Sequence, residues 1–115
     1  MQHNNVMEIL AEQNIGHSLR ISQQIYDLQK QADLIIAYLN SESHSNFITQ
    51  ELLKHNSDLA AIQAKVIYTN TFYPKHIHNI IDRYNYTALL KLNATLISSL
   101  QLIDIILSQD LPPTP

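Results

Sequence analysis

The scarcity of helix-breaking residues is the feature that most constrains how this chain can fold. The sequence contains a single glycine, Gly16, and its first proline is Pro74. Glycine and proline are the residues that most often end helices or form turns. Little interrupts a helix before Pro74, so the sequence predicts long helices rather than short strands joined by tight turns.

Apolar residues recur at alternating steps of three and four along residues 7–39. From residue 21 onward the series is apolar without a break, with Ile21, Ile25, Leu28, Ala32, Ile35 and Leu39. Such spacing forms one apolar stripe on a helix that packs against its neighbours at a shallow angle. Asn14, Gly16 and Ser18 weaken the stripe, and a glycine inside a helix costs about 1 kcal/mol relative to alanine. We therefore expect a kink or a break near Gly16.

A second segment, residues 47–69, repeats this spacing after a polar run in which Ser45 or Asn46 can cap a helix. Its stripe consists of Ile48, Leu52, His55, Leu59, Ile62 and Val66. Pro74 fits the first turn of the next helix, whose stripe is predicted at Ile77, Ile80, Ile81, Tyr84 and Ala88. Because residues 85–87 either bend this helix or divide it, three and four helices are both open.

The last apolar stretch, residues 89–107, carries large side chains on two faces of a helix. One face has Leu89, Leu92, Leu96 and Ile103, and the other has Leu90, Ile97, Leu100 and Leu107. A helix that is apolar on most sides lies at the centre of a fold or in an oligomer. We predict an all-α fold, an antiparallel helical bundle of three to four helices with long heptad-patterned helices. It would form one domain over residues 1–111, followed by an extended Pro-rich tail at residues 112–115.

The composition argues against several classes of function. The formal net charge is −3, and the seven Lys and Arg residues are scattered singly, so we expect no nucleic-acid binding. The chain has no cysteine, no Gly-rich phosphate loop and no Gly-x-Ser-x-Gly motif. We therefore expect neither an enzyme nor a bound cofactor.

The stretch most similar to a membrane span is residues 88–107, which include Lys91 and Asp104. Each of these charges costs roughly 2.5–3.5 kcal/mol at the centre of a membrane, so we expect no membrane span. The first residues lack the positive and apolar regions of a signal peptide. A cytoplasmic location is therefore expected.

Two pairs of potential metal ligands are spaced four residues apart, Glu51 with His55 and His78 with Asp82. Residues at that spacing share one face of a helix, so the four could hold a divalent ion if their helices faced each other. Metal sites in helical bundles generally use Glu-x-x-His with further glutamates on partner helices, which this chain lacks. A metal- or ligand-binding bundle is the alternative hypothesis, and ordinary helix-surface pairs are the preferred interpretation.

The leading hypothesis is a non-catalytic protein–protein interaction module: an adaptor, a chaperone, an inhibitor or immunity protein, or a small subunit of an assembly. A continuous first helix would extend past the shorter second helix and leave Val6, Met7, Leu10 and Ile15 without a partner in the chain. Exposed apolar patches of this kind mark interfaces, and a two-fold homo-oligomer would cover this one. A second candidate surface is aromatic and consists of Phe72, Tyr73, Tyr84 and Tyr86.

Overall fold

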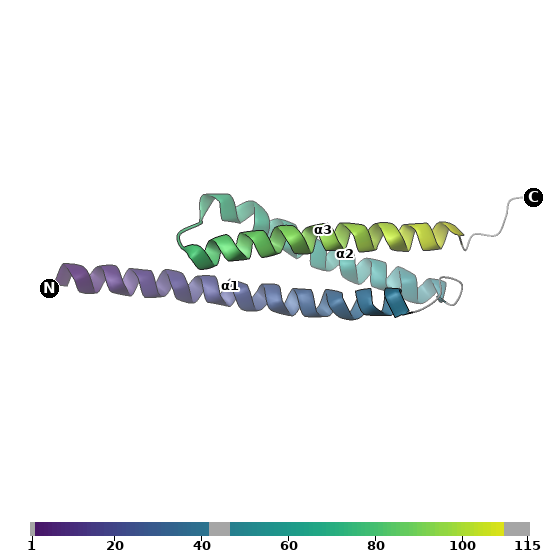
Figure 1. Ribbon diagram of the computed structural model, residues 1–115, viewed down its shortest axis with the longest axis horizontal. Helices are drawn as coiled ribbons and strands as arrows, with labels where there is room; N and C mark the ends of the chain where they lie inside the picture. Colours follow the sequence, from purple (N-terminus) through teal and green to yellow (C-terminus); the bar gives the residue numbers. More distant parts are fainter. Residues whose placement is uncertain (1, 42–46, 110–115) are drawn as a thin grey trace, which may run out of the picture.

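The structure is a computed structural model that describes residues 2–41 and 47–109, with side chains from residue 15 onward. In these ranges the chain forms three α-helices, α1 (Gln2–Ser41), α2 (Thr49–Phe72) and α3 (Ile80–Gln109), and the short 3₁₀ helix η2 (Tyr73–Lys75), with no strand. The helices lie side by side along the long axis of the molecule (Figure 1). The prediction of an all-helical fold is confirmed, and the described residues contain three long helices rather than four.

The helices are more continuous than the sequence suggested. Helix α1 runs through Gly16 without ending, and α3 runs through residues 85–87. Gly16 keeps a negative φ, so its backbone does not leave the helical region. Pro74 lies in η2 and not in the first turn of α3, so its predicted position is wrong. The proposed caps Ser45 and Asn46, and the predicted tail at residues 112–115, lie outside the described residues.

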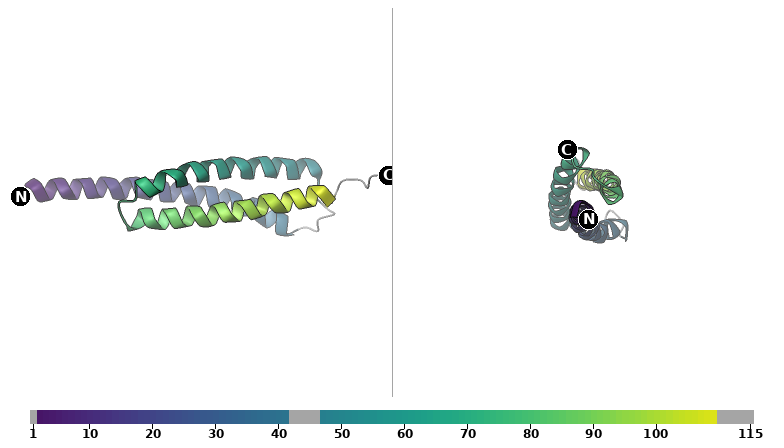
Figure 2. Two further views of the ribbon diagram at one scale, coloured as in Figure 1. Left: turned by 90° about the horizontal axis from the view of Figure 1, so that it is seen from above. Right: turned by 90° about the vertical axis from the view of Figure 1, so that its left-hand side faces the viewer.

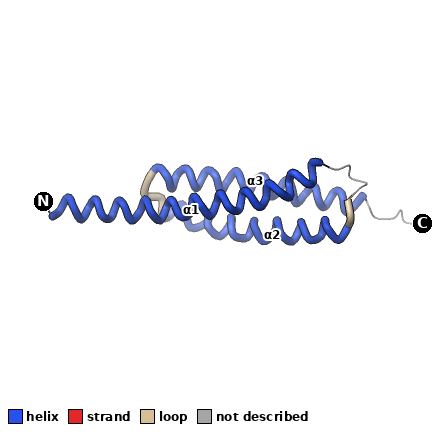
Figure 3. The backbone as a smooth tube through the Cα atoms, turned by 90° about the horizontal axis from the view of Figure 1, so that it is seen from below, coloured by secondary structure: helices blue, strands red, loops and turns tan. Residues whose placement is uncertain are grey.

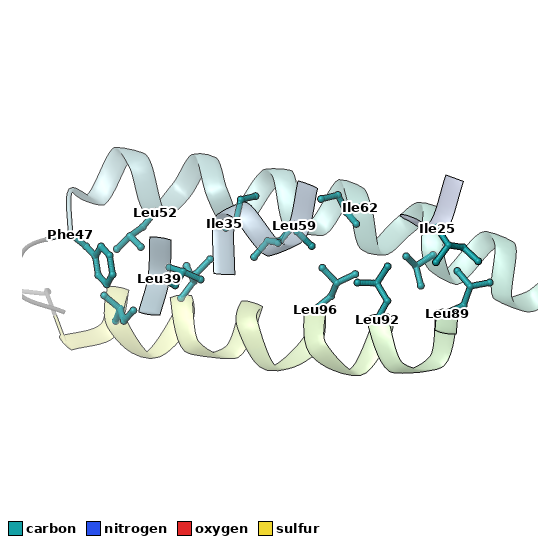
Figure 4. Packing of buried hydrophobic residues seen from close by; sticks show 14 of the residues in the cluster. Ile25, Ile35, Leu39, Phe47, Leu52, Leu59, Ile62, Leu89, Leu92 and Leu96 are labelled. Carbon is teal, nitrogen blue, oxygen red and sulfur yellow. The ribbon is translucent and has the colours of Figure 1, made fainter. Parts of the chain in front are cut away.

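The buried side chains follow one stripe on each helix and meet in a single core, part of which is shown in Figure 4. Leu28 is half-buried, and the stripe of α3 is apolar from Leu89 to Ile106 except at Ser99. The expected burial is confirmed at Ile21, Ile25, Ile35, Leu52, Leu59 and Ile62. The spacing of the apolar residues therefore located most of the core.

Two parts of the predicted stripes are wrong. Ile48 is 58% exposed, and Phe47 is buried instead. Ile80 and Tyr84 are 81% and 73% exposed. Helix α3 begins at Ile80, so these residues lie on the outside of its first two turns. The stripe of α3, followed back from residue 89 in steps of four and three, falls on residues 85 and 82, which are polar.

Helix α1 extends past the other two helices at its N-terminal end (Figures 2 and 3). It has 40 residues and α2 has 24, lengths of about 60 Å and 36 Å at 1.5 Å per residue. Ser18 is buried and bonded to the first turn of α3. We call residues 2–16 the overhang, because this part of α1 precedes that contact. Its 15 residues correspond to about four helical turns, or about 22 Å.

The expectation that no segment could cross a membrane is wrong. Helix α3 is long and apolar enough to do so, as judged by its length and composition. The cost of Lys91 and Asp104 was given too much weight, because the many Leu and Ile residues around them keep the whole stretch apolar. One such helix is weak evidence for a membrane protein, because the core helix of a soluble protein meets the same criteria.

Candidate functional site

A cap of hydrogen bonds starts helix α3 and holds its first acidic side chain in place. Asn79 precedes the helix, and its Oδ1 accepts a bond of 2.8 Å from the backbone N–H of Asp82. The Oδ2 of Asp82 in turn accepts a bond of 2.9 Å from the backbone N–H of His78. This exchange resembles a capping box, in which side chains satisfy the free N–H groups at a helix start. The cap fixes the carboxylate of Asp82 so that it faces α1.

Helix α1 meets this cap through the side chain and the carbonyl group of Ser18. The hydroxyl of Ser18 donates to Asp82 Oδ1 at 2.7 Å and accepts from Asn79 Nδ2 at 3.0 Å. Asn85, one turn further along α3, donates from Nδ2 to the backbone oxygen of Ser18 at 2.9 Å. Its Oδ1 accepts from the hydroxyl of Ser22 at 2.7 Å. The hydrogen bonds between these two helices therefore form only when Ser18 of α1 lies beside the first turns of α3.

The polar cluster also includes a tyrosine from η2. Asn85 Nδ2 lies 3.0 Å from the hydroxyl oxygen of Tyr73, to which it donates, and Tyr73 is 1% exposed. Burial raises the pKa of Tyr73 above its ordinary value of 10.0, and the charge of Asp82 acts in the same direction, while the bond from Asn85 acts against it. We define the polar cluster as Ser18, Ser22, Tyr73, Asn79, Asp82 and Asn85.

The stability of the protein is expected to fall above pH 10.0, in part because of Tyr73. The raised pKa means that the folded state keeps the phenol proton better than the unfolded state does. The stabilisation is complete below pH 10.0 and is lost as the pH rises through the folded-state pKa. Urea unfolding on both sides of pH 10.0 measures this effect. The free energy of unfolding should fall less steeply with rising pH for Tyr73→Phe than for the wild type. Tyr84→Phe is the control, since Tyr84 is 73% exposed. If the free energy of unfolding fell equally steeply with pH in both variants, the prediction would be contradicted.

The chemistry of the polar cluster favours positioning over catalysis. Asp82 is 3% exposed, and both of its carboxylate oxygens accept hydrogen bonds from within the chain. A satisfied buried network rigidifies a core and restricts the arrangements that the helices can adopt. A slip of α1 along α3 by one turn would separate Ser18 from Asp82 and Asn85. The cluster therefore determines where α1 stops contacting the bundle and where the overhang begins.

The structure does not bring the four metal-ligand candidates together. Glu51 accepts a bond of 2.6 Å from the hydroxyl of Tyr38, and the ring of His55 packs on the ring of Tyr38 with centroids 4.9 Å apart. This pair lies in the first two turns of α2, whereas His78 and Asp82 lie at the start of α3, at the other end of the bundle (Figure 1). Among the described residues, no group of three or more His, Cys, Asp and Glu side chains could hold a metal ion.

The aromatic candidates do not form one surface. Tyr73 is buried in the polar cluster and Tyr86 is half-buried. Phe72 is 44% exposed, stacks on His76 with ring centroids 3.8 Å apart, and borders a depression between α1 and α2. Tyr84 borders a different depression, between α1 and α3. These four residues therefore do not act as a single aromatic patch.

The apolar candidates at the start of α1 lie in the overhang. Ile15 is 40% exposed. The backbone positions of Val6, Met7 and Leu10 are helical, and their side chains lie outside the described part of the structure. The packing of α1 against the other helices, predicted for residues 7–39, therefore begins at about residue 18. The overhang continues the same helix toward the N-terminus.

Sequence reasoning missed an open groove between α1 and α2. These two helices pack on each other less extensively than either packs on α3. The groove has a volume of about 620 Å³ at its centre, where it is lined by Gln24, Asp27, Leu28, Ala64, Lys65, Tyr68 and Thr69. It continues at one end to His17 and Phe72, and at the other end to Ile35 and Asp58. We call this surface the α1/α2 groove.

The fold and these sites define a class: an all-helical protein with three long helices, a buried polar cluster and a projecting helix end beside an open groove. No protein-family model, no curated protein and no solved structure matches the chain. The function is therefore inferred from the chain's own surfaces.

Proposed function

We propose that this chain is a non-catalytic protein–protein interaction module, built on an antiparallel bundle of heptad-patterned helices, that associates with itself or with another protein. An adaptor, a chaperone, an inhibitor or immunity protein, and a small subunit of an assembly all fit this description. The spacing of buried residues in steps of three and four supports the heptad pattern. The course of the chain in Figure 1 supports the antiparallel arrangement. A cytoplasmic location stays a prediction.

The observation that carries this proposal is the overhang. An isolated helix of about four turns is marginal in water, because most helical stability comes from tertiary packing. The overhang nevertheless continues α1 as a helix past the end of the bundle (Figure 3). Its sequence includes Val6, Met7, Ile9, Leu10 and Ile15. A helical segment with this many large apolar residues gains stability when a partner covers it.

The test compares two aspartate substitutions in the overhang. Alternating steps of four and three lead from Met7 through residues 11 and 14 to Ser18 and Ile21, so Met7 lies on the same stripe as these two residues. Asn5 falls on the opposite side of the helix. Met7→Asp should weaken association at least tenfold, and Asn5→Asp, which adds the same charge, should leave it unchanged. The readouts are sedimentation equilibrium of the 13.2 kDa chain and quantitative affinity capture from an extract of the native host. Equal behaviour of both variants and the wild type in both assays would contradict the proposal.

Insertion of α3 into a membrane is the second candidate function, favoured by the length and apolar composition of that helix. Some of its large apolar side chains are incompletely covered, since Leu90, Ile97 and Ile105 are 44%, 41% and 53% exposed. For this candidate, the protein should float with phosphatidylcholine vesicles in a density gradient, and Ile97→Lys should reduce the floating fraction. Absence of the protein from the vesicle fraction would contradict this candidate and leave the first one standing.

A further inference from the structure

The overhang and the α1/α2 groove have matching lengths. On α1 the groove runs from His17 to Ile35, which is about 28 Å of helix. The overhang is about 22 Å long and ends where the groove begins, at residue 17. A helix of this length laid into the groove would cover most of it, and a helix in a groove is a common mode of protein recognition.

The groove also offers the surface that such a helix needs. Leu28 is half-buried at its centre, and Ile21, Ile35 and Ile62 line its two ends. Tyr68, 80% exposed, stands at its rim. Apolar residues at the centre with exposed aromatic and charged residues at the edge are typical of an interface.

From these features we propose that the overhang of a second copy of this chain occupies the α1/α2 groove, in a dimer whose two-fold axis passes near His17. The proposal rests on the proposed function and specifies its partner and surface. With the axis at residue 17, the two α1 helices run antiparallel, and residues 2–16 of one copy lie beside residues 18–32 of the other. Each groove then receives one overhang, so the interface is closed and uses the same surface on both copies.

Helical spacing places two of the apolar residues of the overhang on the required side. Val6 and Leu10 lie eleven and seven residues before His17, spacings that return to the same face of a helix. That face lines the groove at His17, Gln24 and Leu28. Residues equally far from residue 17 are level with each other, so Val6 lies beside Leu28 of the other copy and Leu10 beside its Gln24.

The charges of the groove bear on how the acidic residues of the overhang are placed. The two acidic residues in the overhang are Glu8 and Glu12. Lys65 and Arg20 line the groove and are exposed, as are the acidic residues Asp27 and Asp58. Because Leu28 and Lys65 border the same part of the groove, Glu8 of one copy lies within about one helical turn of Lys65 of the other. Glu12 lies within about one turn of Arg20 by the same counting. Glu8 is also nearly level with Asp27 of the other copy, which borders the same part of the groove, so Glu12 is the acidic residue whose charge the groove favours.

Cysteine cross-linking tests the position of the axis, and the chain suits this method because it has no cysteine of its own. A single cysteine at His17→Cys should form a disulfide-linked dimer under mild oxidation, because a two-fold axis brings the two copies of residue 17 within disulfide reach. Leu19→Cys is the matched control, since Leu19 is 53% exposed and lies on another side of α1. Cross-linking of Leu19→Cys equal to that of His17→Cys would overturn the proposed axis.

A pair of tyrosine substitutions tests the groove. Tyr68→Glu should weaken the dimer at least tenfold in sedimentation equilibrium. Tyr84→Glu should leave it unchanged, because Tyr84 is similarly exposed and borders the other depression, between α1 and α3. A wild-type dimer that tolerates Tyr68→Glu would overturn the groove assignment while leaving the proposed function intact. A monomeric wild type without His17→Cys cross-linking would overturn the dimer, and the Met7→Asp capture comparison would then decide the proposed function separately.

Discussion

Leu89→Ala is expected to lower the free energy of unfolding by about 2–5 kcal/mol, the range measured for leucine-to-alanine changes in packed cores. Leu89 is completely buried, and it belongs to the cluster where all three helices meet (Figure 4). The substitution removes apolar contacts and leaves a cavity that the long, continuous helices around it can close only in part. The effect is large relative to the total stability of a small domain.

The neighbouring leucine supplies the control. Leu90 is 44% exposed, so Leu90→Ala should cost less than about 1 kcal/mol. Both variants have the same chemical change in the same helix, one residue apart. Urea unfolding followed by circular dichroism measures the difference, at one protein concentration because self-association would add stability. Similar losses for both variants would mean that the stripe from Leu89 to Ile106 does not face the core.

Asn85→Ala is expected to cost about 2–4 kcal/mol, since it removes three hydrogen bonds in a site that is 1% exposed. The amide links Ser18 and Ser22 of α1 to Tyr73 of η2. Its loss leaves the hydroxyl of Tyr73 and the carbonyl of Ser18 without this donor, away from water. The destabilisation should be accompanied by loosening of the contact between the start of α3 and the middle of α1.

Asn93→Ala is the matched control for this prediction. Asn93 lies two turns further along α3, is half-buried, and accepts a longer bond of 3.4 Å from Gln63. We expect its loss to cost less than about 1 kcal/mol. Thermal and urea unfolding of both variants measure the difference. If Asn85→Ala were no more destabilising than Asn93→Ala, the polar cluster would contribute no more than an ordinary partly exposed hydrogen bond.

Much of the core could be predicted from the sequence, because apolar periodicity depends on helix geometry alone. The stripes through Ile25, Ile35, Leu59 and Ile62 followed directly from steps of three and four. The start of the third helix could not be predicted in the same way. Its first turns carry exposed Ile80 and a buried carboxylate, the reverse of what hydrophobicity indicates.

The candidate site was predicted less well than the core, and the polar cluster shows why. Ser18 was read as a weak point of a stripe and Asn85 as a potential helix break. A signal was nevertheless present, since residues 82 and 85 continue the spacing of Leu89 and Leu92. Their burial depends on partners about 60 residues away in the sequence, and local patterns contain no information about such pairings.

By itself, the sequence determined that the chain is helical, that its helices are long, and where most of the inward-facing apolar residues of the first two helices lie. Those properties follow from helix propensity and spacing, which act within a few turns. Only the tertiary structure decided that Ser18 pairs with Asp82, that the overhang begins just before this contact, and that a groove stays open between α1 and α2. These features depend on how helices far apart in the sequence are aligned along one another, because hydrogen bonds and packing between helices set that alignment.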